Sequence, residues 1–293
     1  MITRWVSGFL VGGALLAAAC GEDDDLLGSN DGGNASGLVD GAPASDVAQF
    51  DVAPLDAGAI DAPAIDAALD GSGVDGARDA GFEAGPLNLQ QGWALHNWRL
   101  TDDNTGLAKY TFQEGGLVAI QTANPDPSAY YNLQTLSNVV VRGRFSIQTT
   151  SDDDFVGFVF GWQDPQHFYF FDWKQATQPY ATCGTASVGA SLKVMNSDSP
   201  ASLCGDFWNS AGSDRTKILA SRTLNPVGWK DNGVYDFTLV FKPGDISIEV
   251  REGANVVVNI KSNDSTFVDG KFGFYNYSQQ SVRYEGFDVN PAP

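Results

Sequence analysis

The chain has 293 residues with 36 acidic and 17 basic side chains, which gives a net charge of −19. Most of this charge lies in residues 21–86, which hold 13 Asp, 2 Glu and 1 Arg, whereas residues 87–293 carry only −6. An acidic balance of this kind argues against nucleic-acid binding, which needs a basic face to neutralise phosphates. The uneven charge predicts one mildly acidic globular domain behind an acidic tail.

Residues 1–20 have the features of a targeting segment. Arg4 precedes an apolar run of about a dozen residues, and small residues lead directly to Cys20. The run is too short for a spanning helix. The segment resembles a bacterial lipobox, with Leu16 one place further from the cysteine than usual. We expect Cys20 to be lipidated and to anchor the chain to a membrane, at the cell surface or the periplasmic face of the outer membrane. An ordinary secretory signal is the alternative.

Residues 21–86 have the composition of a disordered linker. They are almost entirely Asp, Ala, Gly and Pro with a few aliphatics, too little apolar surface to offset chain entropy. Five aspartates recur at a spacing of five residues: Asp46, Asp51, Asp56, Asp61 and Asp66. A β-helix coil and a calcium-binding repeat array are alternatives. A spacer is favoured over a β-helix, because the repeats make up only about one coil and are interrupted by Pro54 and Pro63. It is favoured over a calcium-binding array, because such arrays need Asp at alternate positions rather than at every fifth.

From residue 92 onward, the sequence predicts strands about every ten residues. Alternating apolar and polar residues and hairpin-type connections favour a two-sheet antiparallel sandwich. The predicted strands are Gly116–Thr122, Val139–Gln148, Phe155–Trp162, His167–Lys174, Ser191–Met195, Val234–Phe241, Ile246–Arg251, Val256–Lys261, Lys271–Tyr277 and Ser281–Val289. In the strand that starts at Phe155, alternation predicts one common face for Val156, Phe158, Phe160 and Trp162.

Two cysteines, Cys183 and Cys204, fall within the predicted domain. In an exported protein such a pair is more often a disulfide than a redox or metal site. Closing a loop of this length would stabilise the fold by about 3 kcal/mol on the chain-entropy model. The sequence does not show whether the two residues are close enough to pair.

Several motifs in order resemble the C-terminal lectin-like domain of the thrombospondins. The resemblance runs roughly from residue 88 to residue 290. It is carried by Asn124–Pro127, Arg144-Phe145, Asp152–Gln163, Trp173–Gln175, Ser191–Val194, Val227–Asp231, Gly270–Gly273 and Ser278-Gln279. It implies a concanavalin-like jelly-roll β-sandwich, calcium binding and extracellular attachment. The repeat arrays that accompany the animal domain are absent from this sequence, so partners that engage those arrays are not implied.

Three consecutive acids, Asp152, Asp153 and Asp154, stand before the strand that begins at Phe155. Three like charges in one loop are costly without a cation, and Ca²⁺ accepts several oxygen ligands in flexible geometry. The loop that holds Asp126 and the strand end at Lys174-Gln175 are both expected at the same end of the sandwich. A strand of eight residues is about 26 Å long, so Asp164 falls at the opposite end. We therefore predict Ca²⁺ ligands at Asp126, Asp152, Asp153 and Asp154, with a solvated acidic turn as the alternative.

No sequence motif indicates an enzyme. The domain has four glutamates, of which Glu249 and Glu252 are three apart and point to opposite faces of a strand. An exposed tryptophan could stack on a sugar ring. We nevertheless expect the core to contain Trp93, Trp98, Trp208 and Trp229. The sequence therefore predicts a non-enzymatic, calcium-binding adhesion or matrix-interaction module. Its partner is an extracellular protein or a glycan. A carbohydrate-binding lectin-like module is the first alternative, and a polysaccharide-acting enzyme is the second.

Overall fold

The computed structural model describes residues 86–103, 106–221 and 227–293. The predicted signal segment, Cys20 and all but the last residue of the predicted linker lie outside the described residues. Within the described residues, no helix is both long enough and apolar enough to cross a membrane.

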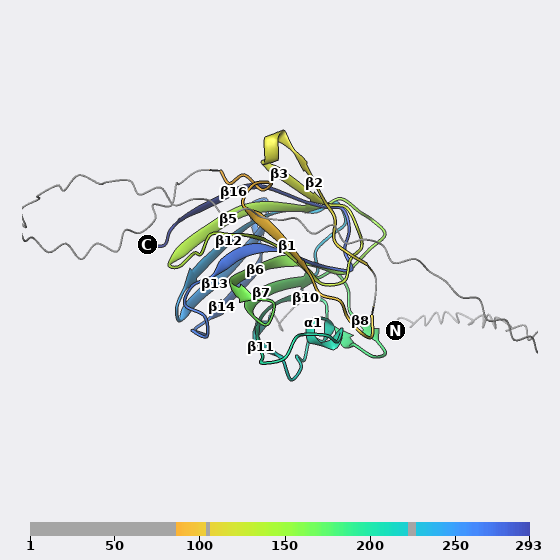
Figure 1. Ribbon diagram of the computed structural model, residues 1–293. Helices are drawn as coiled ribbons and strands as arrows, with labels where there is room; N and C mark the ends of the chain where they lie inside the picture. Colours follow the sequence, from red (N-terminus) through yellow and green to blue (C-terminus); the bar gives the residue numbers. More distant parts are fainter. Residues whose placement is uncertain (1–85, 104–105, 222–226) are drawn as a thin grey trace, which may run out of the picture. The chain divides into compact units, whose positions relative to one another are not determined.

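Two seven-stranded antiparallel sheets form the domain (Figure 1). In spatial order, the first contains β1 (Trp93–Asn97), β4 (Ser128–Asn132), β15 (Lys271–Tyr277), β6 (Phe155–Asp164), β7 (His167–Lys174), β10 (Gly189–Asn196) and β11 (Thr216–Ser221). The second contains β14 (Asn255–Ser262), β13 (Asp245–Glu252), β12 (Val234–Lys242), β5 (Val139–Ile147), β16 (Val282–Pro291), β3 (Val118–Gln121) and β2 (Tyr110–Gln113). The predicted all-β, concanavalin-like sandwich is confirmed.

The main core lies between the two sheets. Inward residues of β5 and β12 alternate with outward polar residues, as in a sheet with one solvated face. The ring of Phe158 on β6 stacks on Phe237 of β12, with centroids 4.8 Å apart. Aromatic rings of this size dominate the apolar area that a sandwich buries. This core fixes the register of the strands whose ends carry the candidate site.

A second apolar cluster lies on the other face of the first sheet. It explains why β6 and β7 are buried along almost their whole length. The cluster is covered by a two-stranded ribbon, β8 (Gln178–Tyr180) and β9 (Gly184–Ala186), and by the short helix α1 (Gly205–Trp208). Its buried members include Phe155, Val159, Trp162, Phe168, Phe170, Phe207, Trp208, Tyr275 and Tyr277. We call the covering segments the cap.

The predicted common face of β6 is wrong at its end. Val156, Phe158 and Phe160 do enter the main core, but Trp162 belongs to the cluster under the cap. The pairing of β6 with β7 shifts register after Phe160, and Gly161 adopts a positive φ of 56°. One bulged residue reverses the side-chain alternation beyond it, and glycine permits that backbone.

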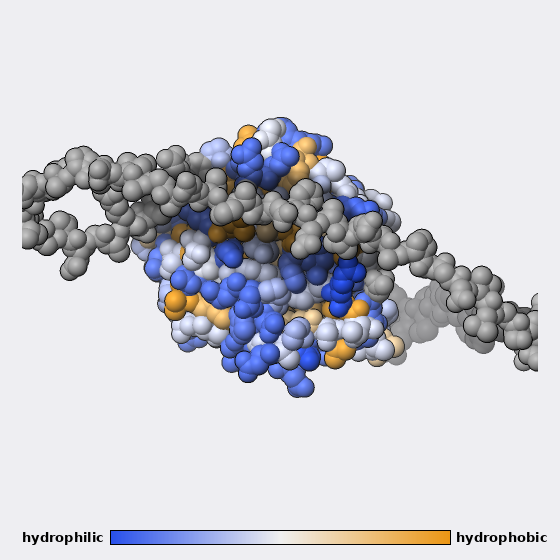
Figure 2. All heavy atoms as spheres, in the orientation of Figure 1, coloured by the Kyte–Doolittle hydropathy of each residue, from blue (hydrophilic) through white to orange (hydrophobic). Residues whose placement is uncertain are grey.

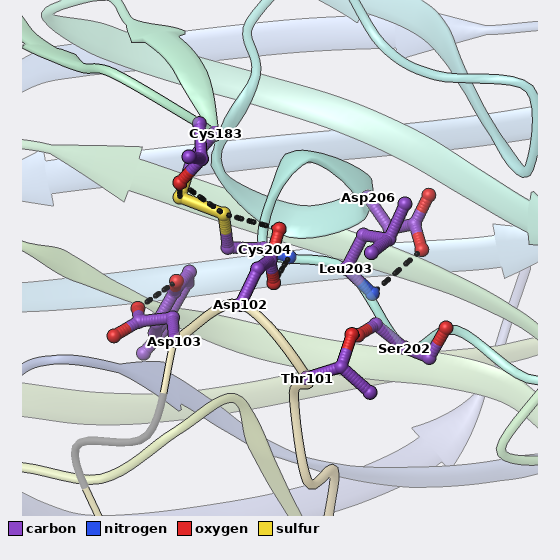
Figure 3. The surroundings of a disulfide bond; sticks show 10 residues. Thr101, Asp102, Asp103, Cys183, Ser202, Leu203, Cys204 and Asp206 are labelled. Atoms are coloured by element: carbon purple, nitrogen blue, oxygen red, sulfur yellow. Dashed lines mark hydrogen bonds between the residues drawn. A yellow bond between two sulfur atoms is a disulfide. The ribbon is translucent and has the colours of Figure 1, made fainter.

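Cys183 and Cys204 form the predicted disulfide, with Cα atoms 5.0 Å apart. Figure 3 shows that it joins the turn between β8 and β9 to the segment before α1. The same segment is held by Asp102, whose carboxylate accepts the backbone amide of Cys204 at 2.8 Å. The disulfide therefore joins two parts of the cap over the second cluster.

The four tryptophans singled out by the sequence belong to the interior. Trp98, Trp208 and Trp229 are buried. Trp93 is half-buried and stacks on Phe274, with ring centroids 5.1 Å apart. Their interpretation as core residues is confirmed, so they do not form an exposed platform for a sugar ring.

Candidate metal centre

The three consecutive acids form one compact group immediately before β6. One carboxylate oxygen from each of Asp152, Asp153 and Asp154 lies within 4.8 Å of the other two. The loop is fixed through its backbone: Trp229 Nε1 donates to the Asp154 carbonyl at 2.9 Å, and Gln279 Oε1 accepts the Asp154 amide at 3.0 Å. Anchoring of this kind keeps the carboxylates together despite their mutual repulsion.

A fully buried lysine at the end of β7 contacts this acidic group. Lys174 Nζ lies 2.6 Å from Asp154 Oδ1 and 3.0 Å from Asp153 Oδ1. It also donates to the Asp153 carbonyl at 3.0 Å and to Gln178 Oε1 at 2.9 Å. The ring of Trp208 lies 5.0 Å from the ammonium. The charge is thus surrounded by oxygens and aromatic faces, which compensates its removal from water.

Electrostatics within the loop favour an additional cation. Burial, followed by repulsion from Asp154, raises the pKa of Asp152 from 3.8 to about 7. Burial also raises the pKa of Asp154, although Lys174 opposes that shift. Both shifts mean that the ionised carboxylates are less stable here than in water. A bound cation would lower both pKa values.

Asp126 lies in the neighbouring loop and does not belong to the group of three. Its side chain is buried. The two loops meet through Asn124, whose amide donates to Asp152 Oδ2 at 3.3 Å. Asp126 instead acts on Tyr277, whose pKa is raised by burial, then by its hydrogen bond to Asp103, and least by Asp126. The structure therefore brings the predicted loops together, with Asp126 set apart from the other three acids.

Asp164 lies at the other end of β6, where the sequence places it. It accepts the amide of Gln166 at 2.7 Å, and its carboxylate lies 2.9 Å from His167 Nδ1. These contacts stabilise the turn into β7. Asp164 takes no part in the acidic group.

The charge balance of the group fits one divalent cation. Three carboxylates and the Lys174 ammonium leave two uncompensated negative charges. Carboxylate, amide and backbone oxygens are the hard donors that Ca²⁺ takes. The donor set and its charge therefore fit Ca²⁺. The ion would stabilise the ionised forms of Asp152 and Asp154, whose pKa values are raised without it.

Sequence reasoning missed the groups that support the acids. Lys174 was expected at the same end of the sandwich, but not as a buried partner of Asp153 and Asp154. Gln279 belongs to the family resemblance without an assigned role, and Trp229 is predicted only as a core residue, not as a donor to the acidic loop. Because β7 runs antiparallel to β6, the end of β7 lies beside the start of β6, and this pairing places Lys174 next to the acids.

Two antiparallel seven-stranded sheets, with an acidic loop at a strand end, define a concanavalin-like β-sandwich domain. The chain belongs to the family described as the thrombospondin C-terminal region, whose model matches residues 106–291. The resemblance seen in the sequence is thereby confirmed.

Individual relatives show the same relationship. The chain is 33% identical over 184 residues to thrombospondin-2 of Gallus gallus, covering 60% of this chain and 16% of that protein. It is 32% identical over 177 residues to thrombospondin-4 of Bos taurus, covering 57% of this chain and 18% of that protein. The chain thus spans less than a fifth of these relatives. Among solved structures, it is similar to the carbohydrate-binding module CBM66 of Bacillus subtilis, with 10% identity, a TM-score of 0.46, and coverage of 68% and 95%.

Proposed function

We propose that this protein is a calcium-binding, surface-anchored module for adhesion or matrix interaction, and that it binds a partner rather than turning over a substrate. The observation that carries the proposal is the acidic group before β6, in which one buried ammonium faces three carboxylates. Membership of the thrombospondin C-terminal family supports an extracellular binding role.

In this proposal, Asp152, Asp153 and Asp154 hold the ion, and the loop of Asp126 completes the shell. Ca²⁺ would neutralise the two charges that Lys174 leaves uncompensated. Its role is structural, because it joins the loops at one end of the sandwich and binds only the folded state. Lys174 and Gln279 would position the carboxylates before the ion arrives.

The metal is tested by thermal unfolding of the full chain in millimolar Ca²⁺ and in chelator. We expect Ca²⁺ to raise the midpoint by about 5 °C or more, because a ligand at about 100 times its Kd stabilises a folded state by about 2.7 kcal/mol. Asp152→Asn should abolish most of this shift. Asp245→Asn is the matched control, since Asp245 is an exposed acid paired only loosely with Lys242. Equal midpoints in Ca²⁺ and chelator would rule out the metal.

The face of the domain in Figure 2 is suited to polar partners. On the face of the domain in Figure 2, hydrophobic residues form separate small patches among hydrophilic ones. Such a surface favours a hydrated glycan or protein over an acyl chain. The two histidines also have structural contacts: His96 packs edge-on against Trp98, and His167 pairs with Asp164. These contacts support binding rather than catalysis.

Anchoring is the second part of the proposal and rests on Cys20. Lipidation there would tether the domain through residues 21–86, the predicted linker. We expect the mature chain to start at Cys20 and to carry acyl groups. Mass spectrometry of the purified protein checks this, with Cys20→Ser as the unmodified control. A mature chain that starts elsewhere would contradict the anchor.

A further inference from the structure

A groove lies on the outer face of the second sheet, formed by β5, β12, β16 and the segment that follows β2. Its volume is about 780 Å³, within the range of small-molecule sites. At the groove β16 bulges, because two of its residues, Gly286 and Phe287, oppose the single residue Gly143 of β5. Gly286 has φ +65°, so a larger residue would be strained there. Glycine therefore keeps the backbone exposed at this point.

Polar side chains cover the floor of the groove in a regular grid. Register pairing across β12, β5 and β16 sets them in two rows, Asp236–Arg144–Glu285 and Thr238–Arg142–Asp288. Neighbouring strands lie about 5 Å apart, and successive outward residues on one strand about 7 Å apart. Within each row an arginine stands between acceptors. The floor thus offers hydrogen-bond donors and acceptors side by side.

The two arginines differ in what they leave available to a ligand. Arg144 is committed to Asp236, with contacts of 2.8 Å and 3.2 Å between the guanidinium and the carboxylate. For Arg142, the described part of the chain supplies no hydrogen-bond or ion-pair partner, although its side chain is exposed at the groove. Its five donors are therefore free to meet a ligand.

The wall of the groove is apolar but not aromatic. Leu117 is 42% exposed, and the half-buried Leu87 lies beside it in the lining. Phe237 and Phe287 also line the groove but are buried, so their rings are not open to a stacking partner. A ligand here would meet aliphatic carbon on one side and the polar grid on the other.

We propose that this groove binds a neutral saccharide chain. A sugar presents C–H groups to an aliphatic wall, and hydroxyl groups that both donate to carboxylates and accept from Arg142. Charges of both signs alternate on the floor, and the whole domain is acidic, which disfavours a polyanion. A peptide strand would add to a sheet edge, whereas this groove lies on a sheet face. The proposal rests on the proposed binding function and gives it a ligand class and a location.

The test is calorimetry of the full chain with a panel of neutral oligosaccharides, namely glucans, mannans, fructans and arabinans, alongside uronate-containing oligosaccharides and an unstructured peptide library. We expect at least one neutral sugar to bind. Arg142→Ala should weaken that binding about tenfold, the effect of losing one hydrogen bond to a charged group. Leu117→Ala should weaken it as well. Arg142 has no hydrogen-bond or ion-pair partner among the described residues, so its replacement leaves no unpaired charge there.

The matched control is Arg251→Ala, which breaks a surface ion pair with Glu249 on the adjacent strand β13, outside the groove. It should leave sugar affinity unchanged. Binding of no neutral sugar, preference for the uronates or peptides, or equal loss in Arg251→Ala and Arg142→Ala would overturn the proposal. Because affinity is measured in Ca²⁺ and metal binding is read from the unfolding midpoint, failure of the groove and failure of the metal site give different results.

Discussion

Replacing Lys174 by methionine is expected to destabilise the metal-free domain by about 3–5 kcal/mol, the usual cost of removing one partner from a buried ion pair. The side chain is fully buried, and its ammonium contacts both Asp153 and Asp154. Without it, Asp154 would remain 10% exposed with no compensating charge. Urea unfolding in chelator measures the loss. The reason is electrostatic, since methionine retains most of the packing volume.

The control for this variant is Lys230→Met. Lys230 pairs with Glu252 at 2.6 Å, but its side chain is 61% exposed, so the expected loss is below about 1 kcal/mol. Ca²⁺ should raise the unfolding midpoint more in Lys174→Met than in the unaltered chain, because three uncompensated carboxylates gain more from a divalent ion. Equal losses in the two lysine variants would show that Lys174 does not balance the acidic loop.

The central strands could be predicted from the sequence because their alternation is strong. Val139–Gln148, His167–Lys174 and Lys271–Tyr277 agree with the observed strands to within one residue. Strands β1, β2, β4 and β11 were missed. They are short, with four to six residues each, and are half-exposed or lack a regular pattern, so their pairing rather than their composition makes them strands.

The cap could not be predicted from the sequence, and neither could the burial of Lys174, which depends on it. Alternation identified one buried face of β6, whereas the cap buries the other face as well. The acids were evident as a run in the sequence, and the end of β7 was expected near them. Burial of Lys174 depends on Trp208 and Gln178 of the cap, which come from a segment without periodicity. Contacts between segments that are distant in sequence leave no periodic pattern in the chain, so they cannot be predicted from it.

A second buried lysine tests whether charge pairing or packing stabilises the first sheet beneath the cap. Lys193 on β10 lies under the cap, with its Nζ 2.6 Å from Asp172 Oδ2 and both side chains about 1% exposed. Among the described residues this oxygen accepts no hydrogen bond, so its contact with Lys193 is mainly electrostatic. Lys193 Nζ also donates to the Phe207 carbonyl at 3.1 Å, and Ser191 Oγ donates to Asp172.

Lys193→Met alone is expected to cost about 3–5 kcal/mol, because it leaves the Asp172 carboxylate buried and unpaired. The double variant Lys193→Met/Asp172→Asn should recover at least half of that loss, since asparagine carries no charge and still accepts from Ser191. Urea unfolding of the two single variants and the double variant gives the coupling energy of the pair. Additive losses would mean that the lysine acts through its packing on Phe155 and Phe170, whose rings lie 5.5 Å and 5.4 Å from Nζ. A large coupling would mean that charge pairing between β7 and β10 stabilises the sheet beneath the cap.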